Sequence, residues 1–70
     1  MKKLADGTRE FFINDRRFLI VESMGDKYEV KTWHEKFNSM CKFAERFTLK
    51  DCKDVANLFE KNGGWDEWMK

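Results

Sequence analysis

The segment from Thr48 to Gly63 constrains the fold most, because it carries the pattern of one capped amphipathic helix. Its apolar side chains recur at helical spacing along one stripe: Leu49, Cys52, Val55, Ala56 and Phe59. Thr48 stands at the N-cap with an acid three residues later, a variant of the capping box with Asp in place of Glu. Gly63 stands where the C′ residue needs a positive φ. We therefore predict one main helix over residues 48–62.

The chain before this helix has the pattern of three antiparallel strands joined by tight turns. Residues 9–13 form a short strand, and Asn14-Asp15 favours a turn, since both side chains tolerate left-handed backbone. Residues 17–22 are apolar without clean alternation, which is typical of a central strand covered on much of both faces. A turn at residues 24–27 then leads to a strand over residues 28–33.

This last strand alternates between two faces. One face carries Tyr28, Val30 and Thr32, and the other carries Glu29, Lys31 and Trp33. A hydrophobic core would not accept Glu29 and Lys31 unpaired. We therefore expect the face that holds Trp33 to be wet.

Residues 34–47 have two interpretations. Phe37, Met40, Cys41 and Ala44 fall at helical spacing and favour a short helix. The alternative is a loop through Asn38-Ser39 and then a short strand over residues 43–47, which we favour. The predicted fold class is α+β: a three-stranded antiparallel meander, with a short fourth strand as an option, packed on one C-terminal helix.

The length of 70 residues allows a single domain, residues 1–70. Residues 1–7 are expected to be a frayed arm. Residues 65–70 hold Trp65 and Trp68, so this end should either dock on the domain or interact with a partner.

Composition and motifs point away from catalysis. The only histidine, His34, is expected at the surface, and it lacks the short ligand spacing to Cys41 and Cys52 that a zinc site needs. No glycine-rich phosphate loop or nucleophile motif occurs. We therefore predict a non-enzymatic protein without cofactor or metal.

Charge and targeting features favour a cytoplasmic protein. The formal net charge is +1, so bulk electrostatics give no steering toward nucleic acid or membrane. The first residues lack a signal peptide, and no segment has transmembrane length. Both thiols are expected to be free in a reducing compartment.

Aromatic residues exceed what one small sheet and helix can bury together. The chain has seven Phe and three Trp. Because Phe11 and Phe12 are adjacent in a strand, they point to opposite faces. The face away from the helix should then carry Trp33 and one of this pair, either for a protein partner or a second copy, or beneath the C-terminal segment. The candidate partner-binding residues are Trp33, Lys31, Arg17, Trp65 and Trp68.

One stretch resembles a pattern of small phage and prophage proteins. Ala44-Glu45-Arg46-Phe47-Thr48-Leu49 matches the start of an Ala-x-x-Phe-(Ser/Thr)-Leu-x-x-Ala unit, with Cys52 where the pattern usually has Ala. In that family the Phe closes a short strand and the Ser or Thr caps a helix. The resemblance implies a phage-encoded inhibitor or modulator that binds a protein of the bacterial host, in host takeover or anti-defence.

The order of three strands and a helix also resembles the arm-binding domain of phage-type integrases. Phe47-Thr48 departs from that family's Phe-x-Thr spacing, and its strong basic charge is missing. This resemblance implies the alternative function, a small DNA-binding domain that uses the exposed face of its sheet. Arg16-Arg17, Lys27 and Lys31 would then supply phosphate contacts.

Overall fold

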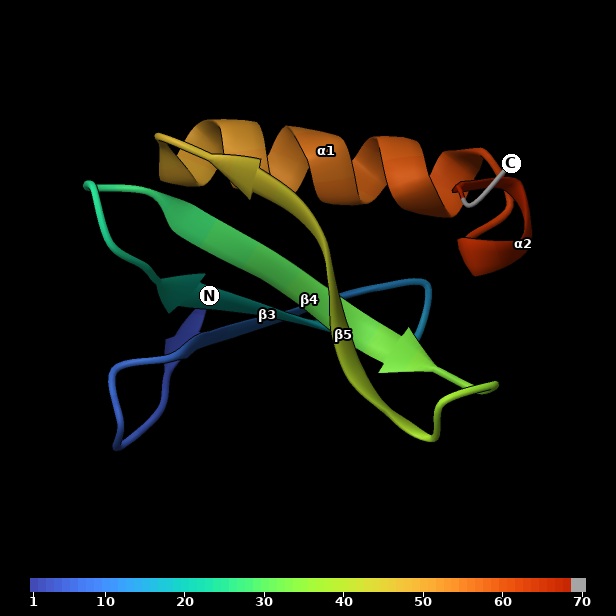
Figure 1. Ribbon diagram of the computed structural model, residues 1–70, viewed down its shortest axis with the longest axis horizontal. Coiled ribbons are helices and arrows are strands. Elements are labelled where there is room, and N and C mark those ends of the chain that lie inside the picture. Colours follow the sequence, from blue (N-terminus) through green and yellow to red (C-terminus); the bar gives the residue numbers. More distant parts are fainter. Residues whose placement is uncertain (69–70) are drawn as a thin grey trace.

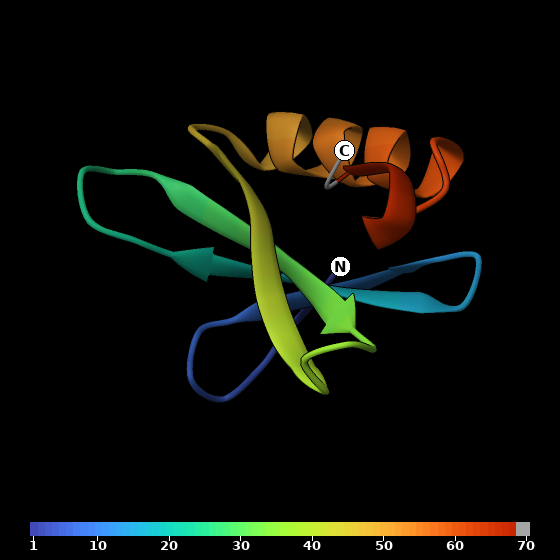
Figure 2. The same cartoon turned by 45° about the vertical axis from the view of Figure 1, so that its right-hand side comes forward.

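A five-stranded antiparallel sheet carries both helices of the described residues on one face (Figures 1 and 2). The computed structural model describes residues 1–68. The elements in chain order are β1 (Lys2–Lys3), β2 (Arg9–Ile13), β3 (Arg16–Glu22), β4 (Tyr28–His34), β5 (Ser39–Arg46), α1 (Leu49–Lys61) and α2 (Trp65–Trp68). The strands lie side by side in chain order, so the sheet is a meander (Figure 1). This confirms the α+β fold, with more strands than predicted.

The two predicted turns between β2, β3 and β4 are confirmed. Ile13 pairs with Arg16, so Asn14 and Asp15 alone connect the strands, with φ of 50° and 68°. Two positive φ values in a two-residue hairpin loop are the mark of a type I′ turn. In the next turn Gly25 has a φ of 74°, and the Ser23 N–H donates to the Lys27 carbonyl.

The segment after β4 forms a loop and a strand, so the helical interpretation is wrong. Residues 35–38 form the loop, and β5 begins at Ser39, earlier than the predicted residue 43. Pairing along the whole of β4 gives the backbone of β5 hydrogen-bond partners that local periodicity does not reveal.

A β-bulge in β5 explains why its apolar pattern looks helical. Val30 pairs with Ala44 while Lys31 pairs with Lys42, so Phe43 is an extra residue. Phe43 and Ala44 both pack against the core. A bulge breaks the alternation of a strand and brings neighbouring residues to one side.

The first residues form an edge strand instead of a frayed arm. Lys2 pairs with Glu10 and Lys3 with Arg9, and the Leu4 N–H donates to the Thr8 carbonyl. The reason is that the outer edge of β2 offers unpaired backbone groups, which this segment satisfies.

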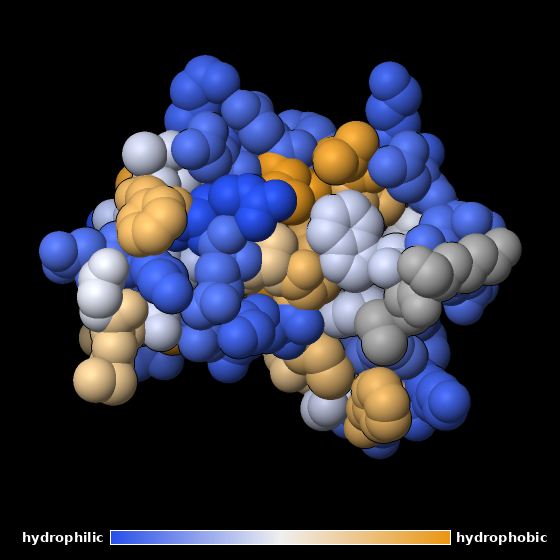
Figure 3. Space-filling view, turned by 45° about the horizontal axis from the view of Figure 1, so that its top comes forward, coloured by the Kyte–Doolittle hydropathy of each residue, from blue (hydrophilic) through white to orange (hydrophobic). Residues whose placement is uncertain are grey.

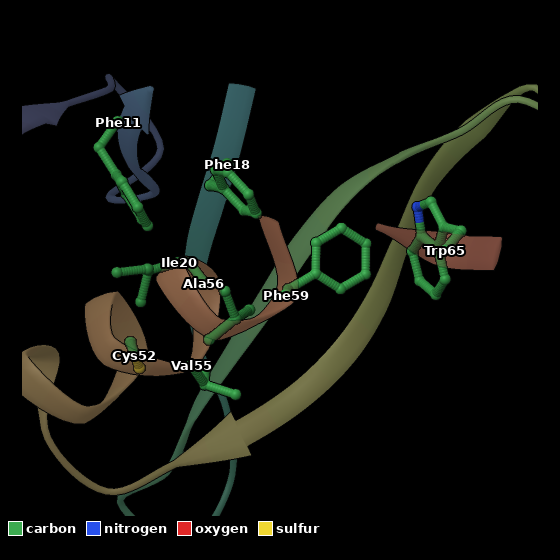
Figure 4. Close-up of a cluster of buried hydrophobic side chains, with 9 residues drawn as sticks. Phe11, Phe18, Ile20, Cys52, Val55, Ala56, Phe59 and Trp65 are labelled. Carbon is green, nitrogen blue, oxygen red and sulfur yellow. The ribbon is translucent and has the colours of Figure 1, made fainter. Parts of the chain in front are cut away.

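The core lies between α1 and the sheet. Phe18, Ile20 and Val30 from the strands are fully buried against Cys52, Ala56 and Phe59 of the helix. The close-up in Figure 4 shows Phe59 between Phe18 and Trp65. The predicted buried stripe of the helix is therefore confirmed. No helix within residues 1–68 is long and apolar enough to cross a membrane.

Both predicted caps of α1 are present. The Thr48 hydroxyl accepts a hydrogen bond of 3.1 Å from the Asp51 N–H. At the other end the Gly63 N–H donates to Glu60 and the Gly64 N–H to the carbonyl of Phe59. Gly63 has a φ of +100°, so this is a Schellman motif.

Thr48→Ala should lower the free energy of unfolding by about 1 kcal/mol, because the Asp51 N–H loses its acceptor at the exposed helix start. Urea unfolding followed by circular dichroism measures this loss. Thr48→Ser is the matched control, since it keeps the hydroxyl and should retain most of the stability. Equal stability of all three proteins would contradict the capping role.

Candidate partner-binding surface

The sheet face away from α1 has no element of residues 1–68 over it, and we name it the open face (Figure 2). Paired residues of neighbouring strands point to the same side, so the strand registers define its members. They are Lys2, Glu10, Phe12, Arg17, Leu19, Val21, Glu29, Lys31, Trp33, Met40, Lys42 and Glu45. β3 is the central strand of the sheet, as predicted, and Leu19 and Val21 on its open face are partly buried.

Two large rings remain exposed on the open face. Phe12 is 60% exposed and Trp33 is 42% exposed. Phe12 pairs with Arg17, and the pairing of Thr32 with Phe18 places Trp33 next to Arg17 on the other side. Arg17 therefore lies between two aromatic positions, as the strand alternation predicted for Trp33 and one member of the Phe pair.

The cations of the open face lie beside carboxylates. Arg17 forms an ion pair with Glu10 through its Nε. Lys31 Nζ is 3.9 Å from Glu29, and Lys42 Nζ is 3.7 Å from Glu45. Such pairs at the protein surface add little stability, about 0–1 kcal/mol each. They leave this face wet and close to neutral in charge, as expected for Glu29 and Lys31.

The two C-terminal tryptophans dock on the helix side of the sheet. Trp65 is 7% exposed, and its Nε1 donates to the Trp33 carbonyl at 2.7 Å. Trp68 donates through Nε1 to the Phe43 carbonyl at 3.0 Å. Trp65 is thus a core residue and not a surface anchor for a partner. These residues also do not cover the open face, and residues 69–70 of the segment lie outside the described residues.

Of the five candidate residues, the open face brings together Trp33, Lys31 and Arg17 and leaves out Trp65 and Trp68. The sequence did not single out Met40, Lys42 and Glu45 for this face. Their strand competed with a helical interpretation, and the bulge hides its alternation. Pairing with β4 is the only signal that places them.

His34 is buried, so the expectation of a surface histidine is wrong. Its ring lies 4.6 Å from Phe37 and 4.5 Å from Trp65, centre to centre. Its Nδ1 accepts the Lys36 N–H at 3.2 Å. Side chains of a strand alternate between its two faces, so every second residue points the same way. His34 therefore lies with Val30 and Thr32 on the side of β4 that faces the helices.

The described residues offer few further groups for metal binding or thiol chemistry. No group of three or more His, Cys, Asp or Glu residues among residues 1–68 could hold a metal ion. Both cysteines are free, and burial raises the pKa of the Cys52 thiol. A depression of about 420 Å³ adjoins Trp33, lined by Asn14, Asp15, Arg16, Arg17, Trp33, Glu35 and Glu60.

Other exposed apolar residues come from separate elements and loops of the chain. Met24 is in a turn, Phe37 in a loop, Phe47 before α1 and Leu58 on α1. Figure 3 turns the α1 side toward the viewer and shows hydrophilic residues around separate apolar patches. Scattered apolar residues of this kind are normal on a protein surface. The open face differs because its rings and aliphatic side chains share one surface.

No protein family, curated protein or solved structure matches this chain.

Proposed function

We propose that this protein is a non-enzymatic binding module that docks a partner protein on its open face. The observation that carries the proposal is the exposure of Phe12 and Trp33 on either side of Arg17. Trp and Arg are enriched among the anchors of protein interfaces, where burying a ring on binding supplies most of the affinity. The strands beneath these side chains hold them on one surface without covering them.

The charges favour a protein over a nucleic acid. Arg17, Lys31 and Lys42 each lie beside a carboxylate of the same face. Phosphate groups would meet those carboxylates, whereas a phosphate-binding surface gathers unopposed cations. DNA binding, the alternative function, therefore receives less support from this surface than protein binding.

The resemblance of residues 44–56 to small phage proteins suggests the class of partner. On that analogy the module would bind a protein of a bacterial host in its cytoplasm and act as an inhibitor or modulator. Binding alone would suffice for such a role, so we assign it no catalytic residue, cofactor or metal.

Trp33→Ala should weaken partner binding by about 2 kcal/mol, or roughly 30-fold, while thermal stability changes little. The Trp33 ring is exposed, and the carbonyl that holds Trp65 belongs to the backbone, so docking of Trp65 survives. The partner is first captured from a nuclease-treated bacterial lysate, and calorimetry then measures its dissociation constant. Leu58→Ala on α1 is the control and should bind like the parent protein.

Two results would count against this proposal. If Trp33→Ala unfolds the domain, Trp33 is a structural residue. The captured material could instead be nucleic acid that high salt releases. If Lys31→Glu then makes the salt dependence of its binding affinity shallower, the DNA-binding alternative holds.

A further inference from the structure

On β4 and β5 the charges of the open face are arranged in two rows of opposite sign. The registers place Lys31 beside Lys42, and Glu29 beside Glu45. On β4 the two rows are two residues apart, or about 7 Å along the strand. On β3, Leu19 lies in line with the lysines and Val21 lies in line with the glutamates. A lysine row and a glutamate row thus run parallel across β4 and β5, with an apolar residue of β3 in line with each. Beyond Leu19, the line of the lysine row reaches Glu10 of β2, which forms an ion pair with Arg17.

A two-fold rotation exchanges these rows. If the axis lies in the plane of contact and runs between the rows, the lysine row of one copy faces the glutamate row of the other. Lys31 then lies over Glu29 of the second copy, and Lys42 over its Glu45. Leu19 lies over Val21 of the second copy in the same way. The rotation keeps the strands of both sheets aligned, which is one of the two usual ways that sheets pack face to face.

We propose that the open face binds a second copy of this chain, in a face-to-face dimer with this symmetry. The proposal rests on the binding role of the open face and adds a second copy of this chain to what that face can bind. Each pair occurs twice in such an isologous interface, and like charges do not meet. The rotation also carries the turn between β3 and β4 of the second copy toward the end of the face that holds Trp33.

The size of the face sets the strength expected of this dimer. The molecule measures 28 by 21 by 21 Å, so one face projects at most about 590 Å² per copy. Stable specific interfaces bury about 600–1,000 Å² per partner. The dimer would therefore bury less than a stable specific interface and belong to the weak, transient class. Area alone does not fix the affinity, so we look for association of the parent protein between roughly 10 μM and 1 mM.

Sedimentation equilibrium of the parent protein across this range tests the association. Lys31→Glu and Glu29→Lys should each weaken the dimer by about tenfold or more, because each places like charges opposite one another twice. Lys50→Glu on the outer side of α1 is the control, since Lys50 pairs with Asp54 far from the open face. This control should associate like the parent protein.

Two restored pairings make the test specific for the proposed geometry. The double variant Glu29→Lys/Lys31→Glu exchanges the charges within each copy and should associate again like the parent protein. A mixture of the two single variants should form a heterodimer, because one copy then presents two carboxylates and the other two ammonium groups. Circular dichroism confirms that each variant is folded.

A parent protein that stays monomeric up to 1 mM would overturn the dimer. So would a dimer that neither single reversal weakens, or one that the double variant and the mixture fail to restore. A monomer that still captures another protein through Trp33 would leave the proposed binding function intact, so the two failures are distinguishable.

Discussion

Phe59→Ala is expected to remove about 3–5 kcal/mol of stability, which is most of what a domain of this size has. Phe59 is fully buried on α1. Its ring packs against Phe18, Phe43 and both C-terminal tryptophans, with ring centres 4.3–6.1 Å away. The alanine variant would leave a cavity at the one point where the helix, the sheet and the C-terminal segment meet.

Leu58 provides the matched control for this prediction. It is the neighbouring residue on the same helix, and its side chain is exposed. Leu58→Ala should change the free energy of unfolding by no more than about 0.5 kcal/mol. Thermal and urea unfolding of both variants measures the contrast. Similar midpoints for the two would mean that the buried stripe of α1 is wrongly assigned.

Trp65→Ala should also cost about 3–5 kcal/mol, because Trp65 is a buried part of the core. Its indole contacts the rings of His34 and Phe59, and its Nε1 donates to the Trp33 carbonyl. The variant loses this packing and frees the C-terminal turn from the sheet. Unfolding experiments in urea measure the loss.

Trp65→Phe separates packing from hydrogen bonding at the same site. It keeps an aromatic ring against Phe59 but removes the donor to the Trp33 carbonyl. A single hydrogen bond contributes about 1 kcal/mol, so this variant should lie between the parent and Trp65→Ala. Met24→Ala, in an exposed turn, should leave stability unchanged. If Trp65→Ala were as stable as the parent, residues 65–68 would not be docked.

Local sequence was sufficient wherever short-range interactions decide the structure. The caps at Thr48 and Gly63 are formed by backbone groups within a few residues, so the limits of α1 could be predicted. Asn14-Asp15 supplies the positive φ angles of its own turn. Alternation along β4 likewise placed Trp33 and Lys31 on the face opposite Val30, because successive side chains point to opposite sides.

Long-range pairing decided what the local pattern left open. Residues 39–46 carry helical spacing of apolar residues, yet they form β5 because the edge of β4 offers hydrogen bonds along the whole strand. The bulge at Phe43 accommodates that spacing within the sheet. The same reasoning applies to β1, which pairs where its own sequence predicted only a frayed arm.

The three tryptophans show most clearly which features the sequence determined and which the tertiary structure decided. Sequence alone determined that the chain has more aromatic side chains than one helix–sheet interface can bury, and that Trp33 faces away from the helix. Only the tertiary structure decided that Trp65 and Trp68 dock on the helix side, where the carbonyls of Trp33 and Phe43 accept their N–H groups. Those acceptors lie 32 and 25 residues away along the chain, so no local pattern could indicate them. Because Trp65 and Trp68 dock on the helix side, they do not cover the open face.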